Sequence, residues 1–108
     1  MKEDWEPIVA RLIQRTKEGS LQWQGTGDIF SVSFPEKRSI HVSRTSDENS
    51  GEYDGYSVGL YNEKGSWIDG DWEAQSTLGS QLRALYDAAR RQALDIDGEL
   101  QRLRATLG

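Results

Sequence analysis

The spacing of apolar residues along this chain changes twice, and that change constrains the fold more than any other feature. From about residue 5 to 18 apolar side chains recur every three or four residues, which predicts a helix with one apolar face. From 21 to 69 they alternate with polar residues, as in half-buried strands. The helical spacing returns from 76 to 94. We predict a break near 95 to 98 and then a terminal helix of about ten residues.

Capping signals mark the ends of both main helices. Asp4 is suited to cap the first helix, Pro7 fits its first turn, and Gly19 can adopt the left-handed conformation that ends it. Ser76 or Thr77 can cap the second helix in the same way. These signals support the helix boundaries that the apolar spacing predicts.

The alternating segment predicts an antiparallel meander of four or five strands. Leu21 and Trp23 indicate the first strand, and Gly25 and Gly27 are predicted to turn the chain after it. One sheet face carries the apolar side chains of Phe30, Val32, Phe34, Ile40, Val42, Tyr56, Val58 and Leu60. The other face carries Ser31, Ser33, Ser39, His41, Ser43, Ser57, Gly59, Tyr61 and Trp67.

Both main helices offer an apolar stripe that matches the apolar sheet face. We therefore expect them to cover that face and to leave the polar face uncovered. The predicted fold class is α+β, a single two-layer domain over residues 1–108, with the meander packed on one face by an N-terminal and a C-terminal helix. The stretch 45–52 has no apolar residue and is predicted to be a surface loop.

Composition narrows the chemistry that the chain can perform. The sequence has no cysteine, one histidine (His41) and no apolar run long enough to span a bilayer, so we expect a cytoplasmic protein that is not inserted in a membrane. No nucleotide-binding or metal-binding fingerprint is present, and we predict no catalytic residue, no metal and no cofactor. The alternative is a hydrolase that uses carboxylates, which would require a deep pocket holding Asp or Glu.

Charge is segregated along the sequence. Residues 1–46 carry a net charge of +1, residues 47–76 carry −7 and residues 77–108 carry +1, which together give −5. Nucleic acid is therefore not an expected partner, because phosphate binding requires a concentrated basic surface. The basic side chains of 83–104 alternate with acidic ones, as on solvated helix faces.

The acidic segment is the predicted binding surface of a protein-interaction or regulatory module. An exposed indole among carboxylates suits recognition of a basic protein partner, although Trp72 could equally lie under the following helix. In extended backbone, the carboxylates of Asp69, Asp71 and Glu73 would also face one side of the strand, as the ligands of a metal cation do. The candidate binding residues are Asp47, Glu48, Glu52, Asp54, Asp69, Asp71, Trp72 and Glu73.

Two further possibilities follow from other features. A small-molecule or nucleotide-binding role would use the uncovered sheet face, or cationic side chains in a cleft, such as Arg38, Arg44 or Arg90. The terminal helix carries leucines beyond what a small core needs, at positions 100, 103 and 107. Together with the uncovered sheet face, they predict self-association as a two-fold symmetric homodimer.

Three sequence motifs resemble a family of small bacterial proteins of unknown function with a helix, β-meander, helix arrangement. The motifs are LIQRTKEGSLQW, YSVGLYNEKG and LRALYDAARRQALDIDGEL, which together span most of the chain. The resemblance implies this fold. It implies no catalytic or binding residue, because each motif position is a helix stop or a packing position.

Overall fold

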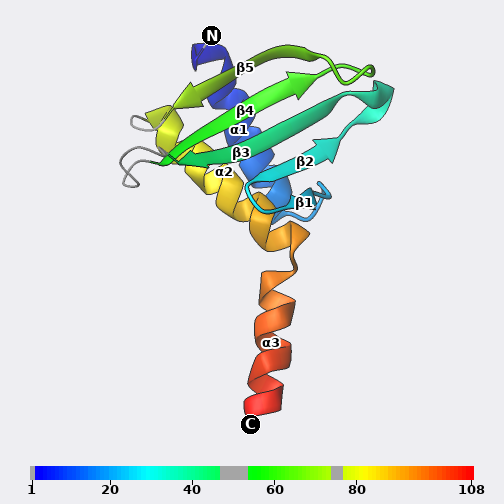
Figure 1. Cartoon of the computed structure of the whole chain (residues 1–108), viewed down its shortest axis with the longest axis vertical. Helices are drawn as coiled ribbons and strands as arrows, with labels where there is room; N and C mark the ends of the chain where they lie inside the picture. Colours follow the sequence, from blue (N-terminus) through cyan, green and yellow to red (C-terminus); the bar gives the residue numbers. More distant parts are fainter. Residues whose placement is uncertain (1, 47–53, 74–76) are drawn as a thin grey trace.

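The computed structural model describes residues 2–46, 54–73 and 77–108. The sheet is antiparallel throughout and its strands follow chain order, β1-β2-β3-β4-β5. The elements are α1 (Lys2–Lys17), β1 (Gln24–Thr26), β2 (Ile29–Ser33), a single 3₁₀ turn (Pro35–Lys37), β3 (Ser39–Ser46), β4 (Asp54–Tyr61), β5 (Trp67–Glu73), α2 (Thr77–Ala93) and α3 (Ile96–Leu107). The predicted α+β class and the meander are confirmed (Figure 1).

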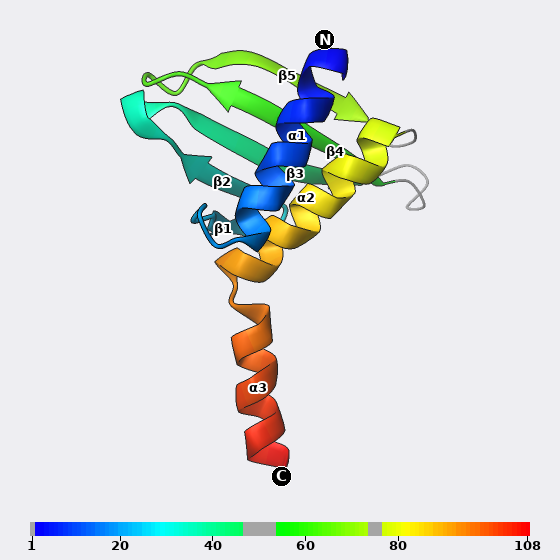
Figure 2. The ribbon, with the colours of Figure 1, turned by 180° about the vertical axis from the view of Figure 1, so that it is seen from behind.

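Two helices form the second layer on one side of the sheet. α1 and α2 lie behind the strands in Figure 1 and in front of them in Figure 2, so the opposite sheet face is open. The strand register explains which side chains they cover, because Phe30, Val42 and Val58 are paired across β2, β3 and β4 and all three are buried. The predicted apolar face is therefore the core face.

The N-terminal helix buries the stripe that its spacing predicts and ends where predicted. Gly19 has a φ of +80°, and the N–H of Ser20 donates to the carbonyl of Arg15. The helix begins at Lys2, however, so Asp4 and Pro7 both lie inside it, and the predicted cap and the predicted place of Pro7 in the first turn are wrong. Trp5 supplies the reason: its indole is buried and donates to Asp69 Oδ2 at 3.1 Å, which holds the turn before Pro7 in the helix.

The first strand also differs from the prediction. β1 is shorter and begins after Trp23, and Gly25 lies within it rather than in the turn at Gly27. Gln92 on α2 explains the difference, because its Oε1 accepts from the N–H of Trp23 at 2.7 Å and its Nε2 donates to the carbonyl of Leu21. A helix side chain thus satisfies backbone groups that a strand partner would otherwise take.

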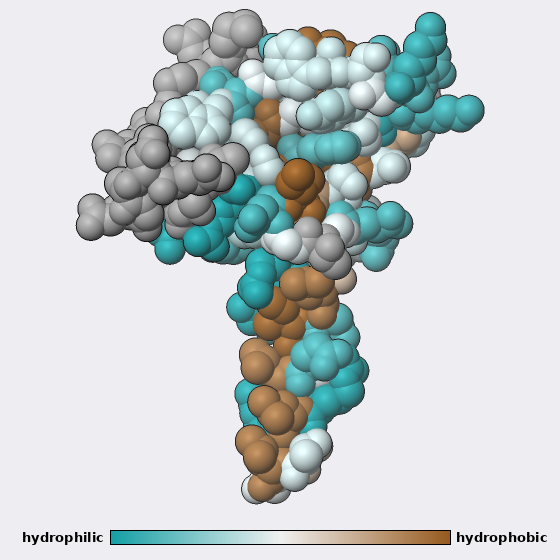
Figure 3. Space-filling model, in the orientation of Figure 1, coloured by the Kyte–Doolittle hydropathy of each residue, from teal (hydrophilic) through white to brown (hydrophobic). Residues whose placement is uncertain are grey.

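The C-terminal helix projects away from the two-layer domain (Figure 1). Asp95 has a φ of +49°, and this left-handed conformation interrupts the helix between α2 and α3, as predicted for this region. α3 has no buried residue, and Leu100, Leu103 and Leu107 are exposed. They contribute to the brown stripe along α3 in Figure 3. No helix in the described ranges is long and apolar enough to cross a membrane.

Deletion of residues 95–108 is expected to leave the Tm within about 3 °C of the full-length value, because α3 contributes nothing to the core. Thermal unfolding followed by circular dichroism measures this. A fall of more than about 10 °C would show that α3 packs on the domain or on a second copy in solution.

Candidate ligand-binding groove

The structure describes only part of the acidic segment that the sequence predicts as a partner surface. Asp47, Glu48 and Glu52 lie outside the described residues. Asp54 begins β4 and Glu73 ends β5. The candidates whose side chains the structure describes are therefore Asp69, Asp71 and Trp72, all on β5.

The register of β5 divides the remaining candidates between the two sheet faces. Asp69 is paired with Leu60 and Asp71 with Val58, which places both on the helix side, whereas Trp72 is paired with Ser57 on the open side. Asp69 and Asp71 do share one side, as predicted. Among the described residues, however, no group of three or more His, Cys, Asp or Glu side chains could hold a metal ion.

An apolar groove lies on the helix side, between α1 and the sheet. Its volume is about 830 Å³. Ile40 on β3 and Leu60 on β4 contribute from the sheet, and Ile8 and Leu12 contribute from α1. Ile8 is 44% exposed, so the groove is open to solvent at this wall. The complete lining is Trp5, Pro7, Ile8, Arg11, Leu12, Arg15, Leu21, Phe34, Arg38, Ile40, Leu60 and Asp69.

The groove exists because the two helices cover the sheet unequally. α2 packs against all five strands, whereas α1 packs mainly on α2 and reaches the sheet chiefly at β5. The apolar residues just after β2, at the start of β3 and at the end of β4 therefore have no helix directly over them. Phe34 and Leu60 are only partly buried as a result.

Three arginines line the groove and give it a positive character. Arg11 and Arg15 are four residues apart and share one face of α1, and Arg38 lies between the 3₁₀ turn and β3. Within the described ranges, none of the three guanidinium groups forms a salt bridge. The carboxylate of Asp69, which also lines the groove, accepts the indole N–H of Trp5.

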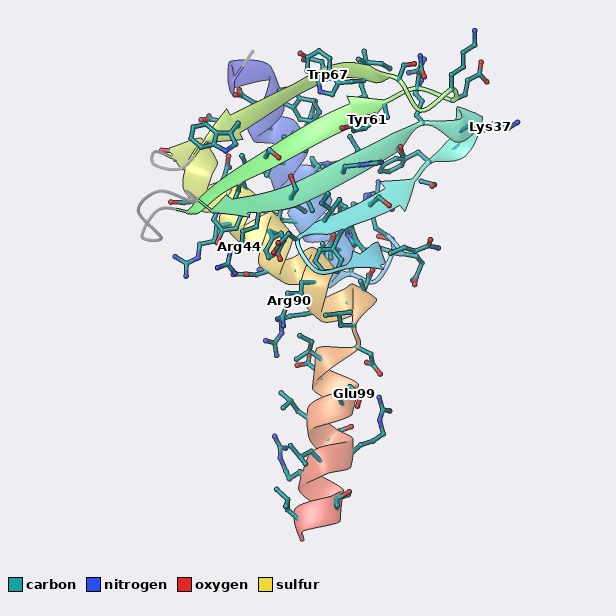
Figure 4. All side chains as sticks on the ribbon, viewed as in Figure 1. Lys37, Arg44, Tyr61, Trp67, Arg90 and Glu99 are labelled. Atoms are coloured by element: carbon teal, nitrogen blue, oxygen red, sulfur yellow. The ribbon has the colours of Figure 1, made fainter. Side chains whose placement is uncertain are left out.

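The sequence identified one of these arginines and missed two. Of the alternatives Arg38, Arg44 and Arg90, only Arg38 lines the groove. Lys37, the residue before Arg38, lies at the opposite end of the sheet from Arg44 (Figure 4). Arg44 and Arg90 both act on the Tyr86 hydroxyl, whose pKa is raised by burial and lowered in part by these two cations. The sequence did contain a signal for Arg11 and Arg15, because these two residues flank the apolar stripe of the first helix.

A second, smaller hollow lies on the open sheet face. Its volume is about 400 Å³, and it is lined in part by His41, Tyr61, Trp67 and Trp72. The rings of His41 and Tyr61 are 4.2 Å apart at their centroids, and burial lowers the pKa of the imidazole. Trp72 is 47% exposed on this face, on the opposite side of the sheet from α2, so it does not lie under that helix.

The lowered pKa of His41 predicts a contribution to the pH dependence of stability. The unfolded chain, with an ordinary histidine pKa near 6.5, takes up the proton before the folded chain does. This contribution to stability is therefore full above pH 6.5 and is lost as the pH falls below it. We expect His41→Gln to lose less stability than the wild type between about pH 7.5 and 5.5 in urea titrations. Equal losses in both proteins would contradict this assignment.

No protein-family model, curated protein or solved structure matches the chain. The family resemblance that the sequence motifs indicate therefore stays a prediction.

Proposed function

We propose that the chain binds a small amphipathic anion, a molecule with an apolar body and one anionic group, in the groove between α1 and the sheet. The observation that carries the proposal is the combination of an apolar groove with Arg11, Arg15 and Arg38 in its lining. These cations come from two separate parts of the chain, so the fold brings them to one place.

The size and lining of the groove favour a small organic ligand. Binding sites for such ligands have volumes of about 300–1,000 Å³ and are mostly apolar, with a few polar groups that fix the orientation. The groove has a volume of about 830 Å³ and is largely apolar. An apolar ligand body would remove Ile8, Phe34 and Leu60 from water, which is favourable in proportion to the area covered.

Charge supports an anionic group on the ligand. The whole chain has a net charge of −5 and would repel an anion in general, so binding depends on a local concentration of cations. Guanidinium groups bind carboxylate, sulfonate or phosphate oxygens through paired hydrogen bonds. Three of them beside an apolar surface favour an amphipathic anion over a neutral ligand or a cation.

The protein-interaction role of the acidic segment stays a prediction that ranks second. Trp72 is exposed, as that role requires, but the register places Asp69 and Asp71 on the other side of the sheet. The register therefore divides these three side chains between the two sides of the sheet, although Asp71 borders the open-face hollow together with Trp72. The groove, by contrast, gathers its apolar and cationic side chains in one concave place.

A matched pair of fluorescent probes tests the proposal. Anilinonaphthalene sulfonate has two aromatic groups and one sulfonate, and N-phenylnaphthylamine has the same aromatic groups without the charge. We expect saturable binding of the sulfonate with one site per chain and at least about tenfold weaker binding of the neutral probe, which corresponds to one charge-assisted hydrogen bond. Equal affinity for the two probes would contradict an anion site.

The variants Arg38→Gln and Arg83→Gln supply a matched comparison. Both remove one exposed arginine, but Arg83 lies on α2 and does not line the groove. We expect Arg38→Gln to weaken binding of the sulfonate about tenfold and Arg83→Gln to leave it unchanged. Equal effects of the two variants would show that the probe senses only the net charge of the chain.

A further inference from the structure

The open face of the sheet is free of charged side chains along its cross-strand rows. One row is Ile29, Ser43, Ser57 and Trp72; the next is Ser31, His41, Gly59 and Gly70; the third is Ser33, Ser39, Tyr61 and Trp67. Aspartate, glutamate, lysine and arginine make up 29% of the chain, yet none of them occurs in these rows, and Asp71 is the one such residue in the lining of the hollow on this face, among the residues that the structure describes. Exposed surfaces normally carry such residues, so the open face is unusual in its composition.

Glycines let the two tryptophans of this face lie close to the sheet. Gly59 and Gly70 are paired between β4 and β5, and a Cβ atom on Gly70 would lie 3.1 Å from the indole nitrogen of Trp67. A Cβ atom on Gly55 would overlap the indole of Trp72. Even so, Trp67 is 60% exposed and Trp72 is 47% exposed. Each indole therefore packs on the sheet and still presents ring surface to solvent.

Hydroxyl groups lie beside each of the two tryptophans on the neighbouring strands. Ser43 and Ser57 are neighbours across β3 and β4, with their Oγ atoms 2.5 Å apart. The phenol of Tyr61 adds another hydroxyl on β4, four residues beyond Ser57 on this face and beside Trp67 (Figure 4). A hydroxyl group can both donate and accept a hydrogen bond. The face thus combines aromatic surface with neutral donors and acceptors.

We propose that the open sheet face binds a neutral oligosaccharide, with sugar rings packed on Trp67 and Trp72 and sugar hydroxyls bonded to the hydroxyl groups of Ser43, Ser57 and Tyr61 beside them. A pyranose ring has a face of C–H groups, which packs on the electron-rich face of an indole, and equatorial hydroxyls at its edge. Trp67 and Trp72 are paired with Tyr61 and Ser57, which are four residues apart on β4, so the two tryptophans are about 13 Å apart along the strand, or roughly two to three sugar rings. This site is separate from the groove on the helix side.

Other occupants fit these side chains less well. A single-stranded nucleic acid would need a cationic groove beside the aromatic rings, and the rows supply no lysine or arginine. A second copy of this sheet face would bury the serine hydroxyls against an opposing face, where each one left without a partner costs free energy. A sugar brings a hydroxyl partner for each of them.

The experiment is a titration of the full-length ¹⁵N-labelled chain with three neutral probes: cellohexaose, chitohexaose and maltoheptaose. We expect at least one probe to give saturable shifts in β3, β4 and β5, with a Kd between about 10 μM and 5 mM. The variants Trp67→Ala and Trp72→Ala are each expected to weaken binding about tenfold or more. Ile29→Ala, which changes another exposed residue of the same face outside the hollow, is the control and should have a smaller effect.

A further variant separates ring position from folding. Gly55→Ala is expected to displace the Trp72 indole, because the contact is with an exposed side chain that can move, and so to weaken sugar binding with little change in Tm. The proposal is wrong if none of the three sugars gives saturable shifts at about 10 mM. It is also wrong if the same tryptophan variants abolish concentration-dependent dimerisation in sedimentation experiments while sugars have no effect.

Discussion

Replacement of Phe30 by Ala is expected to lower the free energy of unfolding by about 3–5 kcal/mol. Phe30 is fully buried, and it lies at the centre of the core face, paired with Val42. Its ring also meets the ring of Tyr86 on α2 edge to face, with centroids 5.6 Å apart. The substitution therefore removes buried apolar area, leaves a cavity and breaks an aromatic contact between the two layers.

Ile29→Ala is the matched control for this prediction. Ile29 is the neighbouring residue of β2, it is 55% exposed, and it lies on the open face. We expect its replacement to change the free energy of unfolding by less than about 1 kcal/mol. Urea titrations of both variants measure the difference. Similar losses in the two variants would contradict the strand register, because a shift of one residue exchanges the two faces.

The double variant Arg11→Gln, Arg15→Gln is expected to weaken binding of anilinonaphthalene sulfonate by about 30- to 100-fold. The two guanidinium groups line one wall of the groove, and neither is held by a salt bridge among the residues that the structure describes. They are therefore available to an incoming anion. Binding of N-phenylnaphthylamine should stay within about threefold of wild type, since the apolar lining is unchanged.

The thermal stability of the double variant is the control for its effect on probe binding. Arg11 and Arg15 are exposed, so their replacement should move the Tm by no more than about 3 °C. The control Arg83→Gln, Arg104→Gln removes the same charge away from the groove. If that control weakens sulfonate binding as strongly as the groove variant does, the groove arginines are not the anion site.

The fold could be predicted from the sequence because its information is local. Alternation fixes which side chains share a sheet face, so the buried set around Phe30, Val42 and Val58 followed from spacing alone. The end of α1 at Gly19 could also be predicted, because it depends on a single residue. The limits of β1 could not, because they depend on Gln92, which is distant in sequence and replaces strand partners for Leu21 and Trp23.

The groove could be predicted only in part, because it depends on how α1 is placed over the sheet. The apolar spacing of α1 indicates that the helix packs on the sheet layer, but not that it reaches the strands chiefly at β5. That placement leaves the region around Phe34 and Leu60 uncovered and brings Arg38 near the arginines of α1. The acidic segment illustrates the same limit, since charge totals do not reveal which face Asp69, Asp71 and Trp72 occupy.

The most direct test of the groove is to map where anilinonaphthalene sulfonate binds. In a titration of the full-length ¹⁵N-labelled chain, we expect the largest amide shifts in α1 around Ile8, in the turn around Phe34 and Arg38, and in β4 at Leu60. The shifts should saturate together with the fluorescence signal. Shifts confined to α3 or to the open sheet face would contradict the account, because the probe would then bind without using the groove.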